Sequence, residues 1–363
     1  MGLNSCNQVG TITGTNQDSS FSLSTSGDTL VYSNNPESLT STSDLADAGA
    51  YLYRDVSPGR TRAWFHHENS ISGTTIYFVV RIVNNQVGSS VDVYLNRTSS
   101  GSSSSSGSSP STAGGAAWAA WFTNSPNGTD TYQTTITNGG TYDIYASSGV
   151  SSGDVLSGIV DFVCTNPSTG AAVAVDVVIF AYSSTSTTPT SAAALNPTSV
   201  GGISYGSTGY AGPVRGTFSN CSRTGSFTWD SSSGSQYLEL FSLYTSAQIT
   251  GEYQSGTDAT NGDTVYIDGN FGIDYNITFT LNDNASPACG TVYGYLQDTG
   301  GTTTYALREN GNTIPSTGYC GPDSTSQAYN FDTTALNGGS TQYTIQIVLP
   351  GGSSGPQQLY WAC

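Results

Sequence analysis

Strand-sized runs of hydrophobic residues recur along the whole chain, and they restrict the possible folds more than any other feature of the sequence. Gly, Asn and Ser bound these runs, and no long stretch has a helical period. The clearest runs cover residues 75–83, 141–145, 159–163, 171–180, 236–244, 275–281, 291–296 and 342–349. The pattern predicts an all-β chain of two antiparallel β-sandwich domains, of the immunoglobulin-like or jelly-roll-like kind.

Two segments of low complexity interrupt this pattern. Residues 101–110 are almost pure serine and glycine, which predicts a flexible loop. Residues 183–205 are rich in Ser, Thr and Pro, which predicts a linker between the domains. We therefore expect the following division: 1–35 as an N-terminal arm or first strand of domain 1, 36–182 as sandwich domain 1, 183–205 as the linker, and 206–363 as sandwich domain 2.

The charge balance argues against two classes of partner. The formal net charge is -17 because basic residues are scarce: the chain has eight Arg and no Lys against 25 acidic residues. Nucleic acid and anionic membrane surfaces both attract Lys and Arg clusters, so neither is expected as a partner. No run approaches the roughly 18 apolar residues of a membrane span. The first six residues also lack the charged and apolar regions of a secretory leader.

Six cysteines are spread along the chain without a CxxC pair, and with only two His in the sequence a zinc site is not expected. An even number of widely spaced cysteines in a low-charge β protein predicts disulfides formed in an oxidising compartment. The expected domain division favours the pairs Cys6–Cys164, Cys289–Cys320 and Cys221–Cys363. Free buried thiols are the alternative.

Two stretches have residue types that bind metals. His66 and His67 are adjacent on an expected strand, where neighbouring side chains point to opposite faces, so packing is favoured over a shared ion. Asp258, Asn261 and Asp263 are oxygen ligands at about calcium-loop spacing, but the later bidentate Glu of an EF-hand is missing. Because Asp, Asn and Gly are also ordinary turn residues, a turn is favoured and calcium is the weaker alternative. No cofactor is expected.

The sequence contains possible glycosylation sites but no recognised catalytic motif. Five Asn-X-Ser/Thr sequons are possible glycosylation sites: Asn96, Asn127, Asn220, Asn276 and Asn284. No GxSxG elbow, P-loop or HExxH motif occurs, so no enzyme activity is expected. A glycosidase with paired carboxylates stays open because its two acids need not be close in sequence.

Two segments resemble a known group of proteins. Residues 54–69, RDVSPGRTRAWFHHEN, look like the "PGR-R-x-F-x-H-H-x-N" entry strand of exported surface proteins from Gram-positive, spore-forming bacteria. Residues 269–279, GNFGIDYNITF, are similar to their "GNYG-x-x-Y-x-I" strand, and Pro350-Gly-Gly-Ser lies in a comparable place. The resemblance implies a wall- or surface-associated β-sandwich protein. The biochemical role of that group is largely uncharacterised, so no catalytic residues carry over.

These observations favour a non-enzymatic, extracellular structural protein. It would be a subunit of a filament, appendage or surface layer on the cell or spore, held by disulfides and by strand pairing between copies. The polar segment through Asn35 is a candidate arm that adds a strand to a neighbour. The alternative is a carbohydrate-binding or adhesion module for surface glycans, which predicts a row of coplanar, exposed aromatic side chains.

Overall fold

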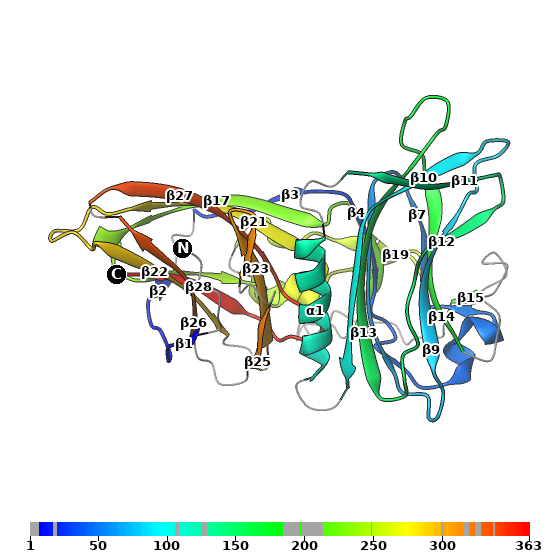
Figure 1. Cartoon of the computed structure of the whole chain (residues 1–363), viewed down its shortest axis with the longest axis horizontal. Coiled ribbons are helices and arrows are strands. Elements are labelled where there is room, and N and C mark those ends of the chain that lie inside the picture. The colour runs from blue at the N-terminus through cyan, green and yellow to red at the C-terminus, as the bar shows by residue number, and fades with distance from the viewer. Residues whose placement is uncertain are drawn as a thin grey trace.

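Strands dominate the computed structural model, which describes residues 7–16, 20–105, 109–124, 129–183, 196–197, 213–247, 249–298, 301, 303–314, 319–323, 328–336 and 338–363. Figure 1 shows two groups of strands with one α-helix, α1 (Ser109–Thr123), between them. The prediction of an all-β, sandwich-like fold is confirmed.

The first sandwich consists of a nine-stranded sheet, sheet 1, and a four-stranded sheet, sheet 2. The order of sheet 1 is β11 (Thr131–Ile136), β10 (Val91–Ser104), β13 (Asp154–Thr165), β8 (Thr61–Asn69), β4 (Thr29–Ser33), β16 (Arg215–Phe218), β19 (Gly256–Asp258) and β20 (Asp263–Val265), with β5 (Ser38–Leu39) beside β8. The order of sheet 2 is β12 (Thr141–Ala146), β9 (Ile76–Val83), β14 (Val175–Ser183) and β7 (Tyr53–Ser57). A separate parallel pair joins β6 (Ala50–Tyr51) to β15 (Asn196–Pro197).

The second sandwich consists of a six-stranded sheet, sheet 3, and a seven-stranded sheet, sheet 4. The order of sheet 3 is β1 (Asn7–Gln8), β26 (Ala328–Ala335), β22 (Thr291–Asp298), β28 (Gln357–Ala362), β18 (Gln236–Leu240) and β2 (Thr15–Asn16). The order of sheet 4 is β24 (Asn312–Ile314), β23 (Thr303–Glu309), β27 (Ser340–Val348), β21 (Asp274–Asn282), β17 (Ser222–Asp230) and β3 (Ser24–Ser26), with β25 (Cys320–Asp323) beside β23.

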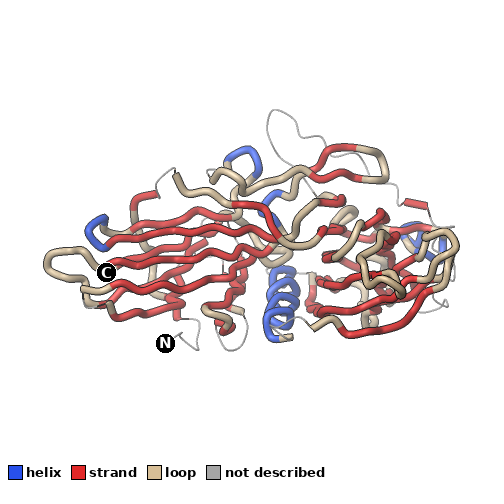
Figure 2. The backbone as a smooth tube through the Cα atoms, turned by 90° about the horizontal axis from the view of Figure 1, so that it is seen from above, coloured by secondary structure: helices blue, strands red, loops and turns tan. Residues whose placement is uncertain are grey.

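Sheet 1 is buried on both faces, because two separate cores meet on it. Ala63 and Phe65 of β8 pack into the core between sheets 1 and 2. Trp64, between them in sequence, points the other way and joins the core of the second sandwich. The apolar side chains of α1, including Trp118 and Trp121, belong to that second core. Figure 2 shows the helix standing between the two groups of strands. Helix α1 and sheet 1 therefore form the packed interface between the two sandwiches.

The segment expected to be a flexible loop is regular structure over most of its described length. Strand β10 continues to Ser104, and α1 begins at Ser109. A β-carbon on Gly101 would lie 2.4 Å from the carbonyl oxygen of Ala113, so the strand and the helix are in direct contact. Small residues in this stretch thus allow close packing, and the prediction of a flexible loop was wrong for residues 101–104, while residues 106–108 lie outside the described residues.

The sandwiches do not follow the contiguous boundaries expected from the sequence. Strands β1, β2 and β3 of the N-terminal segment pair with the second sandwich, whereas β4 enters sheet 1. Strands β16, β19 and β20 lie beyond residue 206 and yet extend sheet 1. Apart from Ser183 and the β15 pair, the expected linker 183–205 lies outside the described residues.

Candidate functional site beneath the N-terminal arm

Three tyrosines form a row across the outer face of sheet 3. Tyr237 of β18 is the register partner of Tyr360 of β28, and Tyr360 is the register partner of Tyr295 of β22. Side chains alternate along each strand, so the leucines next to these tyrosines, Leu238, Leu359 and Leu296, point into the core. The rings of Tyr237 and Tyr360 have centroids 5.0 Å apart. We call these three residues the tyrosine row.

A second row of polar side chains runs beside the first. Glu239, Gln358 and Gln297 are register partners on the same outer face, two residues along each strand from the tyrosines. The amide of Gln358 donates to Glu239 at 3.0 Å, and the Tyr360 hydroxyl donates to the Gln358 oxygen at 2.6 Å. Asn330 of β26 continues the tyrosine row as the register partner of Tyr295. The face therefore combines aromatic rings with uncharged amides and one carboxylate.

Residues 7–16, which we call the arm, cross this face from edge to edge. Strand β1 pairs with β26 at one edge of sheet 3, and β2 pairs with β18 at the other. Between them, the backbone N–H of Ile12 donates to the Gln297 side chain at 2.7 Å. Figure 1 shows β1 and β2 beside β26 and β28 in the left-hand lobe. The outward-pointing Tyr360 and Gln297 are only 3% and 4% exposed, although they face away from the core.

The arm is held by backbone hydrogen bonds rather than by buried side chains. The N–H of Val9 donates to Ala328, and that of Thr15 donates to Ser235, at 2.9 and 3.0 Å. Val9 is 46% exposed, and of residues 9–15 only Ile12 is even half-buried. Little of the apolar surface of the arm's own side chains is removed from water. These side chains therefore contribute little hydrophobic stabilisation to the binding of the arm.

A buried charge cluster joins the two sandwiches. Arg62 of β8 is 4% exposed and makes ion pairs with Asp161 of β13 at 2.9 Å and with Asp274 of β21 at 2.7 Å. Its guanidinium also donates to the carbonyl oxygens of Cys221 and Gly272 at 3.2 and 3.3 Å. One cation thus binds acceptors from both sandwiches.

Hydrogen bonds and ion pairs surround both carboxylates of this cluster. Burial alone would raise the pKa of Asp274, but Arg62 and hydrogen bonds from Gln346 and Ser222 hold it below its usual value. Asp161 accepts from Arg62, from Arg97 and from the indole N–H of Trp121. A cavity of about 370 Å³ adjoins the cluster. The depressed pKa keeps Asp274 ionised, so it is not poised to donate a proton.

The two histidines lie on opposite faces of β8, as expected. His66 contacts the Ser157 hydroxyl at 2.5 Å on the side of the second sandwich. His67 donates from Nδ1 to the carbonyl of Pro36 at 2.7 Å and, at Nε2, accepts from the Ser33 hydroxyl at 3.0 Å. Burial lowers the pKa of His66 to about 4 and that of His67 to about 3, so both are neutral at pH 7. Their role is packing.

Glu252 is a fully buried acid inside the second sandwich with a strongly raised pKa. Burial raises the pKa of its carboxyl to about 7, while the N–H of Phe241 and the hydroxyl of Tyr275 donate to it at 2.7 and 3.1 Å. The residue is 0% exposed. A substrate therefore has no access to this acid.

The weak calcium candidate is a β-turn between β19 and β20. Asp258 is paired with Arg215 at 3.2 Å and also accepts from the N–H of Thr260 at 2.8 Å. The Asn261 amide donates to Asp263 at 2.7 Å, and the Asp263 N–H donates back to the Asn261 oxygen at 2.9 Å. These contacts form the turn that the sequence favoured, and calcium binding there stays the weaker, untested alternative. Among the described residues, no group of three or more His, Cys, Asp or Glu could hold a metal.

The disulfide prediction was wrong in its pairing. Cys289 is bonded to Cys363, whereas Cys164 and Cys221 are free and buried, so Cys6–Cys164, Cys289–Cys320 and Cys221–Cys363 do not form. Cys320 is disulfide-bonded, and Cys6 lies outside the described residues. Cys289 and Cys363 both lie in the expected domain 2, so the division alone does not identify the pair; strand pairing sets which cysteines meet. The alternative of buried free thiols holds for two of the six.

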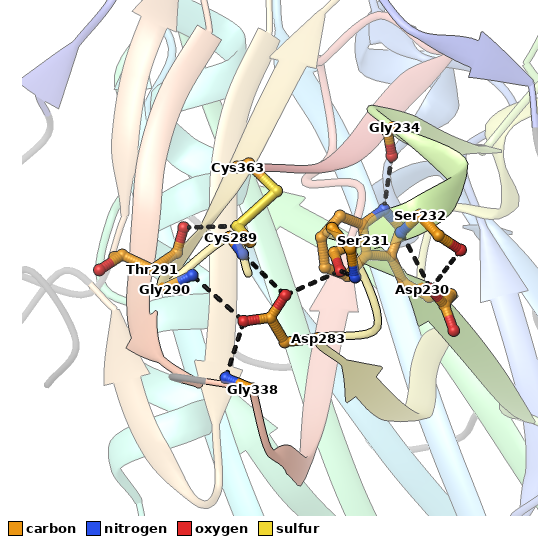
Figure 3. The surroundings of a disulfide bond; sticks show 12 residues. Asp230, Ser231, Ser232, Gly234, Asp283, Cys289, Gly290, Thr291, Gly338 and Cys363 are labelled. Carbon is orange, nitrogen blue, oxygen red and sulfur yellow. Dashed lines mark hydrogen bonds between the residues drawn. A yellow bond between two sulfur atoms is a disulfide. The ribbon is translucent and has the colours of Figure 1, made fainter. Parts of the chain in front are cut away.

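Asp283 organises the loop around the Cys289–Cys363 bond (Figure 3). Its carboxylate accepts backbone N–H groups from Cys289, Gly338 and Gly290 at 2.8, 2.9 and 3.1 Å, and the Ser231 hydroxyl at 2.9 Å. These donors lower the pKa of Asp283 to about 2. The terminal cysteine is thus fixed within its own subunit.

The sequon asparagines differ in exposure. Asn284 is exposed, Asn96, Asn220 and Asn276 are half-buried, and Asn127 lies outside the described residues. The four described side-chain amides each donate a hydrogen bond: Asn96 to Asp130, Asn220 to Gly27, Asn276 to Asp274 and Asn284 to Asp230. Glycosylation stays a prediction, with Asn284 the most accessible of these positions.

The comparisons with known proteins give no family. No family model matches the chain, and no curated protein does. A solved structure of Fet3p, described as a multicopper oxidase that functions in iron import, is 10% identical over 80% of this chain, with a TM-score of 0.11. The match spans half the length of that protein and carries no argument. The resemblance to surface proteins of spore-forming bacteria stays a prediction. No helix among the described residues is long and apolar enough to cross a membrane.

Sequence reasoning did not find the site beneath the arm. Only two aromatic side chains of the described residues are strongly exposed, Tyr132 and Tyr293, and they lie on different sheets. The tyrosine row differs from the predicted row of coplanar exposed aromatics, because Tyr360 is buried beneath the arm and its ring is tilted by 42° from that of Tyr237. The alternation in 236–240, 291–296 and 357–361 marks which tyrosines face outward, but only strand pairing aligns them.

Proposed function

We propose that this chain is a non-enzymatic structural subunit of an extracellular filament, appendage or surface layer, joined to its neighbours by exchange of the arm. The observation that carries the proposal is the way the arm binds: it crosses sheet 3 and pairs at both edges of the sheet. The same pairing in a neighbouring copy would keep every hydrogen bond. Exchange of an identical element is a low-cost route to assembly.

Exchange between copies would be head to tail. The arm of one subunit would lie on sheet 3 of a second subunit. The arm of the second subunit would in turn lie on sheet 3 of a third. A heterologous contact of this kind builds an open chain unless its rotation closes a ring. Because the arm is mostly exposed and bound through its backbone, leaving its own sheet costs little hydrophobic burial.

The body of the subunit suits a repeating unit of fixed shape. Arg62 and helix α1 hold the sandwiches to each other. The Cys289–Cys363 disulfide supports an oxidising, extracellular location. The acids that could serve catalysis are hydrogen-bonded or enclosed, which supports a role without catalysis.

Gly14 provides a variant that tests arm exchange in the full chain. A β-carbon there would lie 2.9 Å from the carbonyl oxygen of Ser235 and 3.3 Å from the Tyr360 ring, so Gly14→Val displaces the arm from any copy of sheet 3. Thr13→Val is the matched control, because Thr13 is exposed. Light scattering and negative-stain microscopy over a concentration series measure assembly.

The wild-type chain and Thr13→Val are expected to form elongated oligomers, and Gly14→Val is expected to stay monomeric. Added salt should promote assembly of the wild type because it screens the repulsion between copies of charge -17. A wild-type chain that stays monomeric at every concentration and salt level would remove the support for this function.

A further inference from the structure

We infer that the outer face of sheet 3 is a binding site for a neutral glycan chain, and that the arm covers it. The inference rests on the proposed function, because the centre of the face, at Tyr360 and Gln297, is accessible only where an arm has left it. In an assembly of exchanged arms, that place is the end subunit, whose face no arm covers.

The geometry of the face matches a linear row of sugar rings. Adjacent strands lie about 4.8 Å apart, so the tyrosine row on three neighbouring strands spans about 10 Å. That length is comparable with two consecutive pyranose rings. Tyr293 extends the aromatic surface, with its ring 6.2 Å from that of Tyr295 and tilted by 24°. Tyrosine offers a flat apolar ring and a polar hydroxyl, which suits a ligand with an apolar C–H face and hydroxyl edges.

The polar row supplies the hydrogen bonds that such a ligand needs. The side chains of Gln358 and Gln297 each carry a donor and an acceptor, and Glu239 accepts through two oxygens. The arm already uses one of these groups, because Gln297 accepts from the N–H of Ile12. A sugar hydroxyl could take the same place once the arm is gone.

Charge decides which glycans fit. Glu239 is the one acidic residue in the two rows, which contain no basic residue, and the formal net charge of the whole chain is -17. An acidic polysaccharide would therefore be repelled and would find no Arg to pair with. A neutral hexopyranose chain has no such penalty.

The test uses full-length variants and two soluble probes, cellohexaose and chitohexaose, in calorimetric titrations. Gly14→Val should bind at least one probe about tenfold more tightly than the wild type or Thr13→Val, because the covered state no longer reduces the apparent affinity. Tyr295→Ser added to Gly14→Val should weaken that binding about tenfold. Tyr295 is only half-buried, so this substitution leaves the core intact.

Hydrogen exchange of the β26 backbone reports whether the arm has left. If Gly14→Val exposes those amides and neither probe binds, the glycan site is overturned, whereas loss of assembly in the same variant would still support arm exchange. If the amides stay protected in Gly14→Val, the arm is not a displaceable cover and the inference fails. Binding that Tyr295→Ser leaves unchanged places the ligand elsewhere and also overturns it.

Discussion

Arg62 should be the most sensitive single charged position for the stability of the whole chain. Arg62→Met keeps much of the side-chain volume but removes the cation between Asp161 and Asp274. Both acids are then left in a buried site, where breaking an ion pair costs about 3–5 kcal/mol. Asp161 keeps its bonds from Arg97 and Trp121, which places the expected loss near the lower end of that range.

Arg60→Met is the matched control. Arg60 pairs with Asp130, but the two side chains are 43% and 26% exposed. An exposed pair of this kind contributes about 0–1 kcal/mol. The same chemical change two residues earlier in the sequence, just before β8, should therefore cost several times less.

Urea unfolding followed by tryptophan fluorescence measures both variants. The rings of Trp118 and Trp121 lie 5.5 and 4.7 Å from the guanidinium carbon of Arg62, so two of the five tryptophans report directly on the junction. Adding Asp274→Asn to Arg62→Met should recover part of the loss, because one of the uncompensated charges is removed. Equal costs for Arg62→Met and Arg60→Met would refute the role of Arg62 as the connection between sandwiches.

Three further predictions concern the cysteines and the response to acid. Replacing Cys289 and Cys363 by Ser removes a disulfide between residues 74 positions apart in the sequence. The free energy of unfolding should fall by about 4 kcal/mol, which a lower thermal unfolding midpoint would show. An unchanged midpoint would contradict a stabilising bond. Burial raises the pKa of Cys164 to about 12 and that of Cys221 to about 11, so a thiol reagent at about pH 8 should label them only after unfolding; fast labelling of the native chain would argue against this burial. The depressed pKa of Asp283 adds stability that is complete above about pH 4 and is lost as the pH falls towards 2. Asp283→Asn should therefore make the stability of the chain less dependent on pH in that range. Identical acid-unfolding curves for the variant and the wild type would exclude the effect.

The strands were predictable because their signal is local. The runs around residues 75–83, 275–281 and 342–349 alternate or are continuously apolar, and each forms a strand close to the expected bounds. The packing role of His66 and His67 followed from the same period of two.

The features that could not be predicted from the sequence depend on contacts between segments far apart in the chain. The disulfide partner of Cys363 is set by the loop before β22, which no spacing rule identifies. The stretch containing Gly101 has small residues where α1 packs closely against it. The composition of that stretch does not reveal the contact between Gly101 and Ala113. The tyrosine row requires the register of β18, β28 and β22, which are separated by long stretches of chain.

Arm exchange is tested most directly by an engineered cross-link. Thr15 and Gln236 are register partners across β2 and β18, so a chain with Thr15→Cys and Gln236→Cys can form a disulfide wherever an arm lies on sheet 3. Thr280→Cys with Gln342→Cys, register partners within sheet 4, is the matched control. In assembled material, a non-reducing denaturing gel should give a ladder of covalent oligomers for the arm pair and a monomer band for the control. A monomer band for both would mean that each arm stays on its own subunit, which would contradict assembly by arm exchange.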